Sequence, residues 1–152
     1  MIKFTTNRFK PGKPYKGDYT VHAEDGTEAN VADLIKGRPA IIDLWASWCK
    51  PCRIHSKELI PIYEKYSPLG LAYVAVARER GNTKAMKKAM EVDGYPWMSF
   101  VDLDDKDGVW KKNGCDNSGG RILLIDSEGK IVAINPSFET VEKYLQDAFR
   151  DE

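Results

Sequence analysis

Apolar residues are gathered along this chain into short runs that alternate with segments of mixed polarity. Residues 40–45 and 71–77 are almost wholly apolar, which predicts two buried strands. Residues 121–126 and 130–134 are apolar on either side of a turn at residues 127–129, and this arrangement predicts a hairpin. These runs together predict a central β-sheet.

A second hairpin is predicted closer to the N-terminus. Polar and apolar residues alternate over residues 19–22, residues 25–26 read Asp-Gly as in a tight turn, and residues 27–29 return along the first strand. Asn30 is a suitable N-cap for a short helix over residues 31–35.

Apolar residues also recur at the three- and four-residue spacing of helices that cover a sheet. This spacing predicts a helix over residues 53–66 that Pro61 kinks, a helix that opens at Asn82, and a closing helix over residues 138–150.

The acidic run over residues 102–108 resembles a calcium loop only at first sight. Lys106 occupies a ligand position and no glutamate closes the loop, so a solvated loop is predicted instead. Asp107 is the expected N-cap of a short helix that Gly114 ends.

The order of these elements predicts an α/β fold, with a mixed central β-sheet flanked by helices and an N-terminal β-hairpin as an extension. Residues 1–17 combine proline and glycine with several lysines and are expected to be a flexible lead-in or linker. Residues 18–152 are expected to form one domain.

Composition narrows the class of protein. The 152 residues include 23 basic and 23 acidic side chains, so no net charge favours nucleic acid or an anionic membrane. No stretch is apolar for long enough to form a membrane span. Three cysteines are too few for a disulfide framework; two of them form a Cys-x-x-Cys pair, which indicates a redox-active dithiol and one further thiol.

The Cys-x-x-Cys pair lies where the strand over residues 40–45 meets the following helix. The N–H groups and the dipole of a helix N-terminus favour a thiolate, so Cys49 is the expected nucleophile, and Lys50 adds a favourable positive charge. Cys49 is also expected to lie nearer the surface than Cys52, the resolving thiol. Pro51 suits the first helical turn because its missing N–H would be unpaired there anyway.

Asp43 lies six positions before Cys49 in an otherwise apolar strand. An isolated buried carboxylate is costly, so we expect burial to raise the pKa of Asp43 toward neutrality. A general base for Cys52 must titrate in that range. The alternative is a carboxylate on the polar face of its strand with no part in chemistry, which the spacing disfavours.

The string Trp-Ala-Ser-Trp-Cys-Lys-Pro-Cys at residues 45–52 resembles the thioredoxin superfamily, in particular its TlpA-like branch of thiol:disulfide interchange proteins. The likeness runs from about Tyr19 to Phe149. It implies a thioredoxin-like fold and a protein-disulfide oxidoreductase that acts on protein thiols and disulfides with an unidentified electron donor. No bound cofactor is implied, because the dithiol itself carries two electrons.

The same resemblance implies a bacterial protein in the periplasm, or tethered outside the cytoplasm, whose signal or anchor is not in this chain. A cytoplasmic location stays open. We expect a monomer.

The sequence departs from this family at Gly119-Gly120. Gly120 falls where the superfamily has a cis-proline facing the cysteine pair. A cis bond before a residue other than proline costs about 3 kcal/mol, so a trans peptide and a looser loop are expected. The resemblance assigns substrate contacts to this region. The expected substrate-binding residues are Trp48, Lys50, Pro51, Trp97, Gly119 and Gly120, although core packing explains Trp97 equally well.

Two other functions stay open. A zinc or copper site could use Cys49, Cys52, His55 and Cys115, but the chain has no second Cys/His pair at finger-like spacing. Otherwise His55 is a solvated helix residue and Cys115 a small buried one. A non-catalytic adaptor is the second alternative. A peroxidase is disfavoured because peroxiredoxin-like proteins have a threonine three positions before the attacking cysteine, whereas this chain has Ala46 there.

Overall fold

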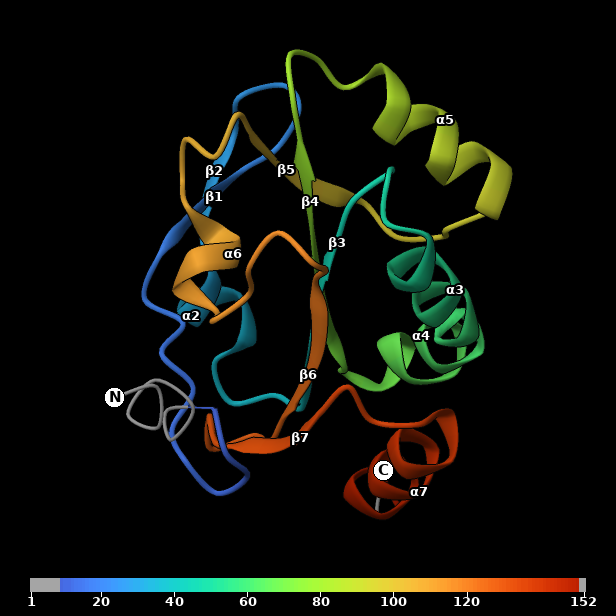
Figure 1. Ribbon diagram of the computed structural model, residues 1–152. Coiled ribbons are helices and arrows are strands. Elements are labelled where there is room, and N and C mark those ends of the chain that lie inside the picture. Colours follow the sequence, from blue (N-terminus) through green and yellow to red (C-terminus); the bar gives the residue numbers. More distant parts are fainter. Residues whose placement is uncertain (1–8, 151–152) are drawn as a thin grey trace.

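A five-stranded sheet lies at the centre of the computed structural model, which describes residues 9–150 (Figure 1). Its strands are β3 (Ala40–Trp45), β4 (Ala72–Glu79), β5 (Ser99–Leu103), β6 (Arg121–Ile125) and β7 (Ile131–Ile134), in the spatial order β5-β4-β3-β6-β7. β3, β4 and β5 are parallel, whereas β6 is antiparallel to both β3 and β7. The mixed sheet expected from the sequence is confirmed.

Helices and a hairpin cover the two faces of this sheet (Figure 1). One face carries α3 (Lys50–Glu58), α4 (Ile60–Tyr66), α5 (Lys84–Asp93) and α7 (Phe138–Ala148), with the 3-10 turn η1 (Ser67–Leu69) after α4. The other face carries β1 (Thr20–His22), β2 (Glu28–Asn30), α2 (Val31–Ile35) and α6 (Val109–Lys112).

Because both faces are covered, all six residues of β3 are buried. Ile42 and Leu44 pack with Val31 of α2, whereas Ile41 packs with Leu145 of α7 on the opposite face. This period of two also directs Asp43 toward the layer of α3 and α4, and so toward the cysteine pair.

The N-terminal hairpin is confirmed as a separate two-stranded antiparallel sheet of β1 and β2. Asn30 caps α2 as expected, because its Oδ1 accepts a hydrogen bond from the Asp33 N–H at 3.3 Å. None of the helices in residues 9–150 has the length and apolar character needed to cross a membrane.

The helix expected over residues 53–66 is in fact two helices that meet at Leu59. α3 begins three residues earlier than expected, at Lys50, and α4 begins at Ile60. Pro61 lies in the first turn of α4, where a proline leaves no helical hydrogen bond unmade. In one continuous helix its ring would clash with the Lys57 carbonyl, so the chain breaks rather than bends.

The prediction of a solvated loop over residues 102–108 is wrong at its first residues. Asp102 belongs to β5 and is 1% exposed. Its two carboxylate oxygens accept hydrogen bonds from the Asp107 N–H at 2.8 Å and the Val109 N–H at 2.9 Å. Asp102 therefore accepts the backbone N–H groups at the start of α6. Asp107, the expected N-cap, instead contacts His22 Nδ1 at 2.7 Å.

Residues 9–17 differ from the flexible lead-in expected over residues 1–17. Phe9 is 8% exposed and packs in the core beneath β6 and β7. The Gly12 N–H donates to the Ile131 carbonyl at 2.7 Å, and the Ile131 N–H donates to the Lys13 carbonyl at 2.9 Å. These residues, the arm hereafter, lie along β7. The first eight residues of the expected lead-in lie outside the described residues.

Candidate active site

Cys49 occupies the N-cap of α3, four residues after the end of β3. It forms a disulfide with Cys52, and its Sγ accepts a hydrogen bond from the Cys52 N–H at 3.4 Å. Pro51 lies in the first turn of α3, as expected. The cysteine pair therefore lies at the positive end of the helix dipole, where a thiolate is favoured.

Cys49 is not the more exposed member of the pair in this oxidised state, contrary to expectation. The residue is 5% exposed, whereas Cys52 is half-buried. The backbone of Gly119 lies over Cys49, since a Cβ built on Gly119 would lie 4.0 Å from the Cys49 Sγ.

Polar contacts fix the loop between β3 and Cys49. The carboxylate of Glu79, at the end of β4, is buried and accepts hydrogen bonds from the Ser47 N–H and Oγ, both at 2.7 Å. Arg53 Nη1 donates to the Ser47 carbonyl at 3.2 Å, and Trp48 Nε1 donates to the Arg78 carbonyl at 3.1 Å. Sequence reasoning missed Glu79, whose only signal is an acid ending an apolar run.

Asp43 is 1% exposed and is held by two hydroxyl groups. Tyr73 OH donates to its Oδ2 at 2.7 Å, and Ser56 Oγ lies 2.8 Å and 3.0 Å from its two oxygens. Burial raises the pKa of Asp43 to about 6, although the hydroxyl contacts and the nearby His55 oppose the rise. The expected burial and raised pKa are confirmed.

Tyr73 and Ser56 are two further site residues that the sequence did not single out. The Tyr73 ring is stacked on Trp97 with centroids 4.1 Å apart, and burial holds the pKa of Tyr73 well above its usual value. Trp97 is 4% exposed and packs in the core with Trp45. Its assignment to the substrate-binding rim is therefore wrong, because its ring supports Tyr73 from within.

Gly120 approaches β3 too closely for any side chain. A Cβ built on Gly120 would lie 1.9 Å from the Leu44 carbonyl oxygen, and the Gly120 N–H donates to Cys52 Sγ at 3.4 Å. None of the peptide bonds in residues 9–150 is cis, so the expected trans geometry is confirmed. The expected looser loop is wrong, because the backbone packs directly against its neighbours.

A cavity of about 630 Å³ joins these groups. His55 in its wall is not a solvated residue, since its Nε2 lies 3.0 Å from the Pro136 carbonyl, to which it donates. The wall also contains three of the predicted substrate-binding residues, Pro51, Gly119 and Gly120. The chemical groups that the cavity brings together are Asp43, Cys49, Cys52, His55, Cys115 and Arg121.

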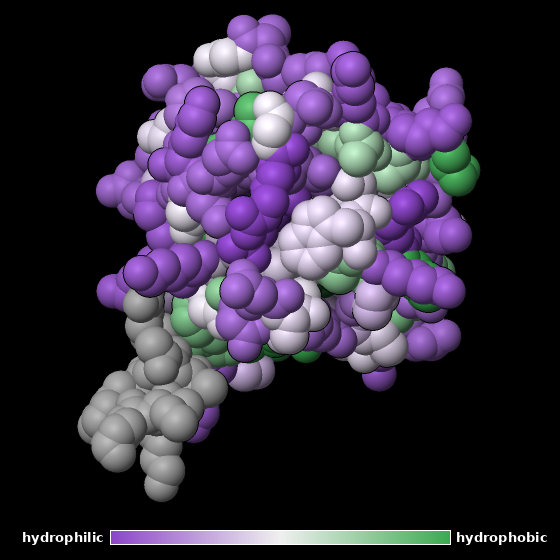
Figure 2. Space-filling model, turned by 45° about the horizontal axis from the view of Figure 1, so that its top comes forward, coloured by the Kyte–Doolittle hydropathy of each residue, from purple (hydrophilic) through white to green (hydrophobic). Residues whose placement is uncertain are grey.

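Beside the cavity, Trp48 and Lys50 are exposed, so both of these predicted substrate-binding residues are accessible to a partner. Trp48 is 51% exposed, and its ring lies against Trp110 with centroids 5.5 Å apart. Figure 2 shows this end of the molecule as mostly hydrophilic, with a pale patch of intermediate hydropathy near its middle.

Cys115 lies in the cavity wall but is poorly suited to react. Burial raises the pKa of its thiol to about 11, against the opposing effect of Arg121. It is therefore a protonated thiol at neutral pH, whereas nucleophilic attack needs the thiolate. No group of three or more His, Cys, Asp and Glu side chains within the described part of the chain is placed to hold a metal ion.

Comparison with known sequences gives a family match over most of the chain. The sequence model of the AhpC/TSA family matches residues 12–134. The thiol:disulfide interchange protein DsbE of Pseudomonas fluorescens biotype C is 29% identical over 122 residues, which cover 79% of this chain and 63% of that protein. The thiol-disulfide oxidoreductase ResA of Bacillus thuringiensis is 26% identical over 116 residues, covering 76% of this chain and 64% of that protein.

Comparison with solved structures gives the same fold. The thioredoxin domain of a thiol-disulfide oxidoreductase from Bacteroides vulgatus superposes with a TM-score of 0.74 at 27% identity, covering 90% of this chain and 98% of that one. The thioredoxin-like fold is thereby confirmed. The chain spans less than two thirds of the length of the two curated relatives described above.

Proposed function

This chain belongs to the AhpC/TSA family, and from that premise we propose that it is a thiol:disulfide oxidoreductase acting on protein partners through Cys49 and Cys52. The observation that carries the proposal is a bonded cysteine pair at the N-terminus of α3, in one cavity with the buried Asp43. The names of the relatives, which include interchange proteins and oxidoreductases, support it.

In the reductive direction, the Cys49 thiolate attacks one sulfur of a substrate disulfide. A mixed disulfide forms and the other substrate sulfur leaves as a thiolate. The N–H groups at the start of α3 stabilise the Cys49 thiolate before the attack, and Lys50 adds a positive charge beside it.

In the second step, the carboxylate of Asp43 accepts the proton of the Cys52 thiol. The Cys52 thiolate then attacks the Cys49 sulfur, which closes the internal disulfide and releases the second substrate sulfur. The Gly120 N–H donates to the Cys52 sulfur in the oxidised state and would also favour its thiolate. We assign Ser56 and Tyr73 as positioning residues, because they hold the Asp43 carboxylate.

No bound cofactor enters this scheme, since the dithiol carries both electrons. We propose that Trp48, Lys50, Pro51, Gly119 and Gly120 contact the protein substrate, and that a monomer acts in the periplasm or tethered outside the cytoplasm. A reduction potential of roughly −270 to −180 mV, between those of thioredoxin and protein disulfide isomerase, is expected for such a pair.

Reduction of insulin with dithiothreitol as donor tests the proposal. The protein should accelerate the reaction well above the donor alone, Cys49→Ser should abolish the acceleration, and Cys115→Ser should leave it unchanged. A wild-type protein that adds nothing to the donor would favour the adaptor alternative. An equally active Cys49→Ser variant would overturn the assignment of the nucleophile.

A further inference from the structure

A shallow hollow of about 360 Å³ lies beside the cysteine pair, on the outer side of α3. Its floor includes Ser47 and the Arg53–Asp93 ion pair, in which the guanidinium meets both carboxylate oxygens at 2.7 Å and 2.9 Å. Its rim is formed by Trp48, Lys50, Ile54 and Lys57.

The rim carries positive charge that the protein neutralises only in part. Lys50 and Lys57 are exposed, and neither forms an ion pair with any carboxylate in residues 9–150. Asp93, the acid of the hollow, is already engaged by Arg53, which is the main cause that holds the pKa of Asp93 below its usual value, while Lys57 adds a weaker charge interaction. Positions 50, 54 and 57 share one face of α3, so their side chains converge on the same hollow.

The same rim is unusually apolar for an exposed surface. Trp48 is 51% exposed and Ile54 is 48% exposed, two of the five large hydrophobic side chains that are strongly exposed in the described residues. The Trp48 ring is held in place by the Nε1 hydrogen bond to Arg78 and by contact with Trp110. A fixed aromatic ring beside free ammonium groups suits a ligand that is apolar and anionic together.

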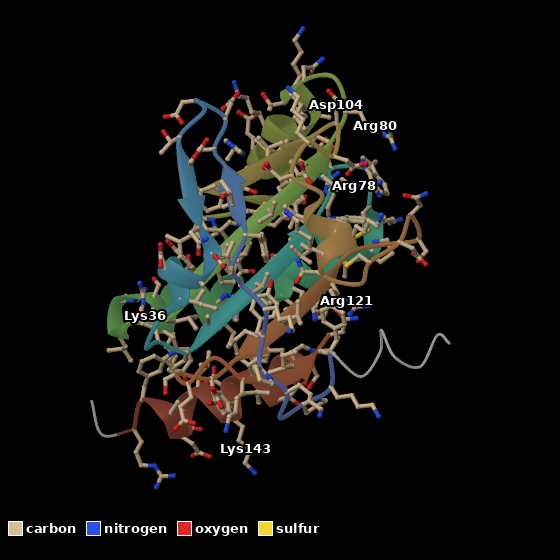
Figure 3. All side chains as sticks on the ribbon, turned by 90° about the vertical axis from the view of Figure 1, so that its left-hand side faces the viewer. Lys36, Arg78, Arg80, Asp104, Arg121 and Lys143 are labelled. Atoms are coloured by element: carbon tan, nitrogen blue, oxygen red, sulfur yellow. A yellow bond between two sulfur atoms is a disulfide. The ribbon has the colours of Figure 1, made fainter. Side chains whose placement is uncertain are left out.

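Further cations lie on the other side of Trp48. Arg80 lines the surface there together with Arg78. Arg80 forms no ion pair within the described residues, whereas Arg78 is paired with Asp105 at 2.7 Å. Figure 3 places Arg78, Arg80 and Arg121 along the edge of the molecule that holds the sulfur atoms, well away from Lys143. Several acids also lie at this edge: Asp105 pairs with Arg78, Glu79 lines the surface beside Trp48, Asp104 accepts the Gly81 N–H, and Asp116 lies in the cavity wall. These acids offset the arginines, so the excess of positive charge is confined to the hollow, where Lys50, Arg53 and Lys57 face the single carboxylate of Asp93.

We propose that this hollow binds the polypeptide that flanks the substrate disulfide, and that it selects a segment carrying a carboxylate next to an apolar residue. The apolar residue would lie against Trp48 and Ile54, and the carboxylate would lie between Lys50 and Lys57. The inference rests on the proposed function and adds a substrate class to it: acidic protein disulfides react faster than basic ones.

The experiment uses two synthetic disulfide peptides that differ only in two residues beside the cysteine, glutamate in one and lysine in the other. Single turnovers with the reduced protein are quenched with acid, and the released peptide thiol is separated from the protein and measured, because the total number of thiols does not change. The glutamate peptide should react about 5- to 10-fold faster at low ionic strength, as two exposed charge pairs allow, and the difference should shrink in 0.5 M salt.

Lys57→Glu should remove or reverse this preference, because it places a carboxylate in the hollow without touching either cysteine. Lys143→Glu, the same change at an exposed position of α7, is the matched control and should keep the wild-type preference. Lys57→Gln should give an intermediate ratio, which separates loss of attraction from added repulsion.

Uncharged hydroxyethyl disulfide distinguishes failure of the proposed charge preference from failure of the proposed oxidoreductase function. Equal rates for both peptides at low salt, with hydroxyethyl disulfide still consumed, would overturn the inference and leave the proposed function intact. An unchanged preference in Lys57→Glu would show that another surface makes the selection and would also overturn it. A wild-type protein that does not react with hydroxyethyl disulfide would overturn both.

Discussion

Asp43 is held by two hydroxyl groups and forms no ion pair, so burial and hydrogen bonds dominate the environment of its carboxyl, with a smaller effect of the nearby His55. Burial disfavours the charged form, while the hydroxyls of Ser56 and Tyr73 favour it, and the balance brings its pKa to about 6. A carboxyl with this pKa is mostly ionised at pH 7 yet basic enough to accept a thiol proton.

Asp43→Asn should keep the fold but slow the resolution of the mixed disulfide about 100-fold near pH 7, because the amide cannot accept the Cys52 proton. In the wild type the same step should slow as pH falls through about 6, where Asp43 becomes protonated. Single-turnover kinetics from pH 5 to 9 measure both effects. Superimposable profiles for the two proteins across that range would remove Asp43 from the mechanism.

Part of this site is predictable from the sequence at the level of single residues. Asp43 stands out because it interrupts an apolar strand six positions before Cys49. Its partners do not, since Ser56 and Tyr73 lie 13 and 30 positions away on other elements and carry no local pattern. For Trp97 the sequence suggested a surface role that the structure does not bear out, because an aromatic run has the same pattern whether its ring faces solvent or a buried tyrosine.

At the level of elements, the end of β4 serves as a rigid support for the loop that carries Cys49. Glu79 uses both carboxylate oxygens on Ser47, and the neighbouring Arg78 carbonyl holds Trp48. Hydrogen bonds to a charged group contribute about 1.5–3 kcal/mol each when they are well formed. The strand therefore fixes the start of α3 as well as filling the sheet.

Glu79→Gln should lower the free energy of unfolding by about 1–2 kcal/mol, because one amide nitrogen replaces an acceptor beside two donors. As a positioning residue, Glu79 should also shift the Cys49 thiolate pKa, read from the pH dependence of iodoacetamide alkylation of the reduced protein. Glu91→Gln, on the exposed side of α5, is the control. Loss of stability with an unchanged alkylation profile would reduce Glu79 to a purely structural residue.

The loop that precedes β6 contacts β3 so closely that it leaves no room for a side chain at Gly120. Gly120→Ala should cost about 3 kcal/mol or more, because its Cβ would meet the Leu44 carbonyl, which belongs to a central strand and cannot yield. Gly119→Ala should be tolerated, since its Cβ meets only the Cys49 sulfur at an ordinary 4.0 Å. Urea unfolding of the two variants measures the difference, and equal stability would show that this loop can move aside.

For the whole molecule, the raised pKa of Asp43 links stability to pH. Between about pH 3.8 and 6 the folded protein keeps a proton that the unfolded chain has lost, so this group lowers stability as pH rises through that window. The cost at pH 7.5 is about 3 kcal/mol, from a rise of roughly two pKa units.

Asp43→Asn should therefore be about 2–3 kcal/mol more stable than the wild type at pH 7.5 and nearly equal to it at pH 4, because asparagine does not titrate. Urea unfolding at the two pH values gives the comparison directly. A variant that is less stable than the wild type at both would mean that the carboxylate is better solvated than its burial implies.

The architecture was largely accessible from hydrophobic periodicity, because buried strands and amphipathic helices each carry their own spacing. What escaped depends on contacts between distant segments. Asp102 reads as part of an acidic loop until it meets the backbone of α6, and Gly12 reads as a linker until it meets Ile131. Local composition describes such residues by their neighbours in sequence, whereas the fold uses their neighbours in space.

The arm over residues 9–17 also changes what the outer edge of the sheet offers to other chains. Ile131 exchanges backbone hydrogen bonds with Gly12 and Lys13, and Tyr15 bonds to the carbonyl of Gly129. A bare edge strand invites an unfolded polypeptide to add itself to the sheet and aggregate. The arm already occupies the backbone groups of Gly129 and Ile131, so this stretch of the edge is closed to an incoming strand.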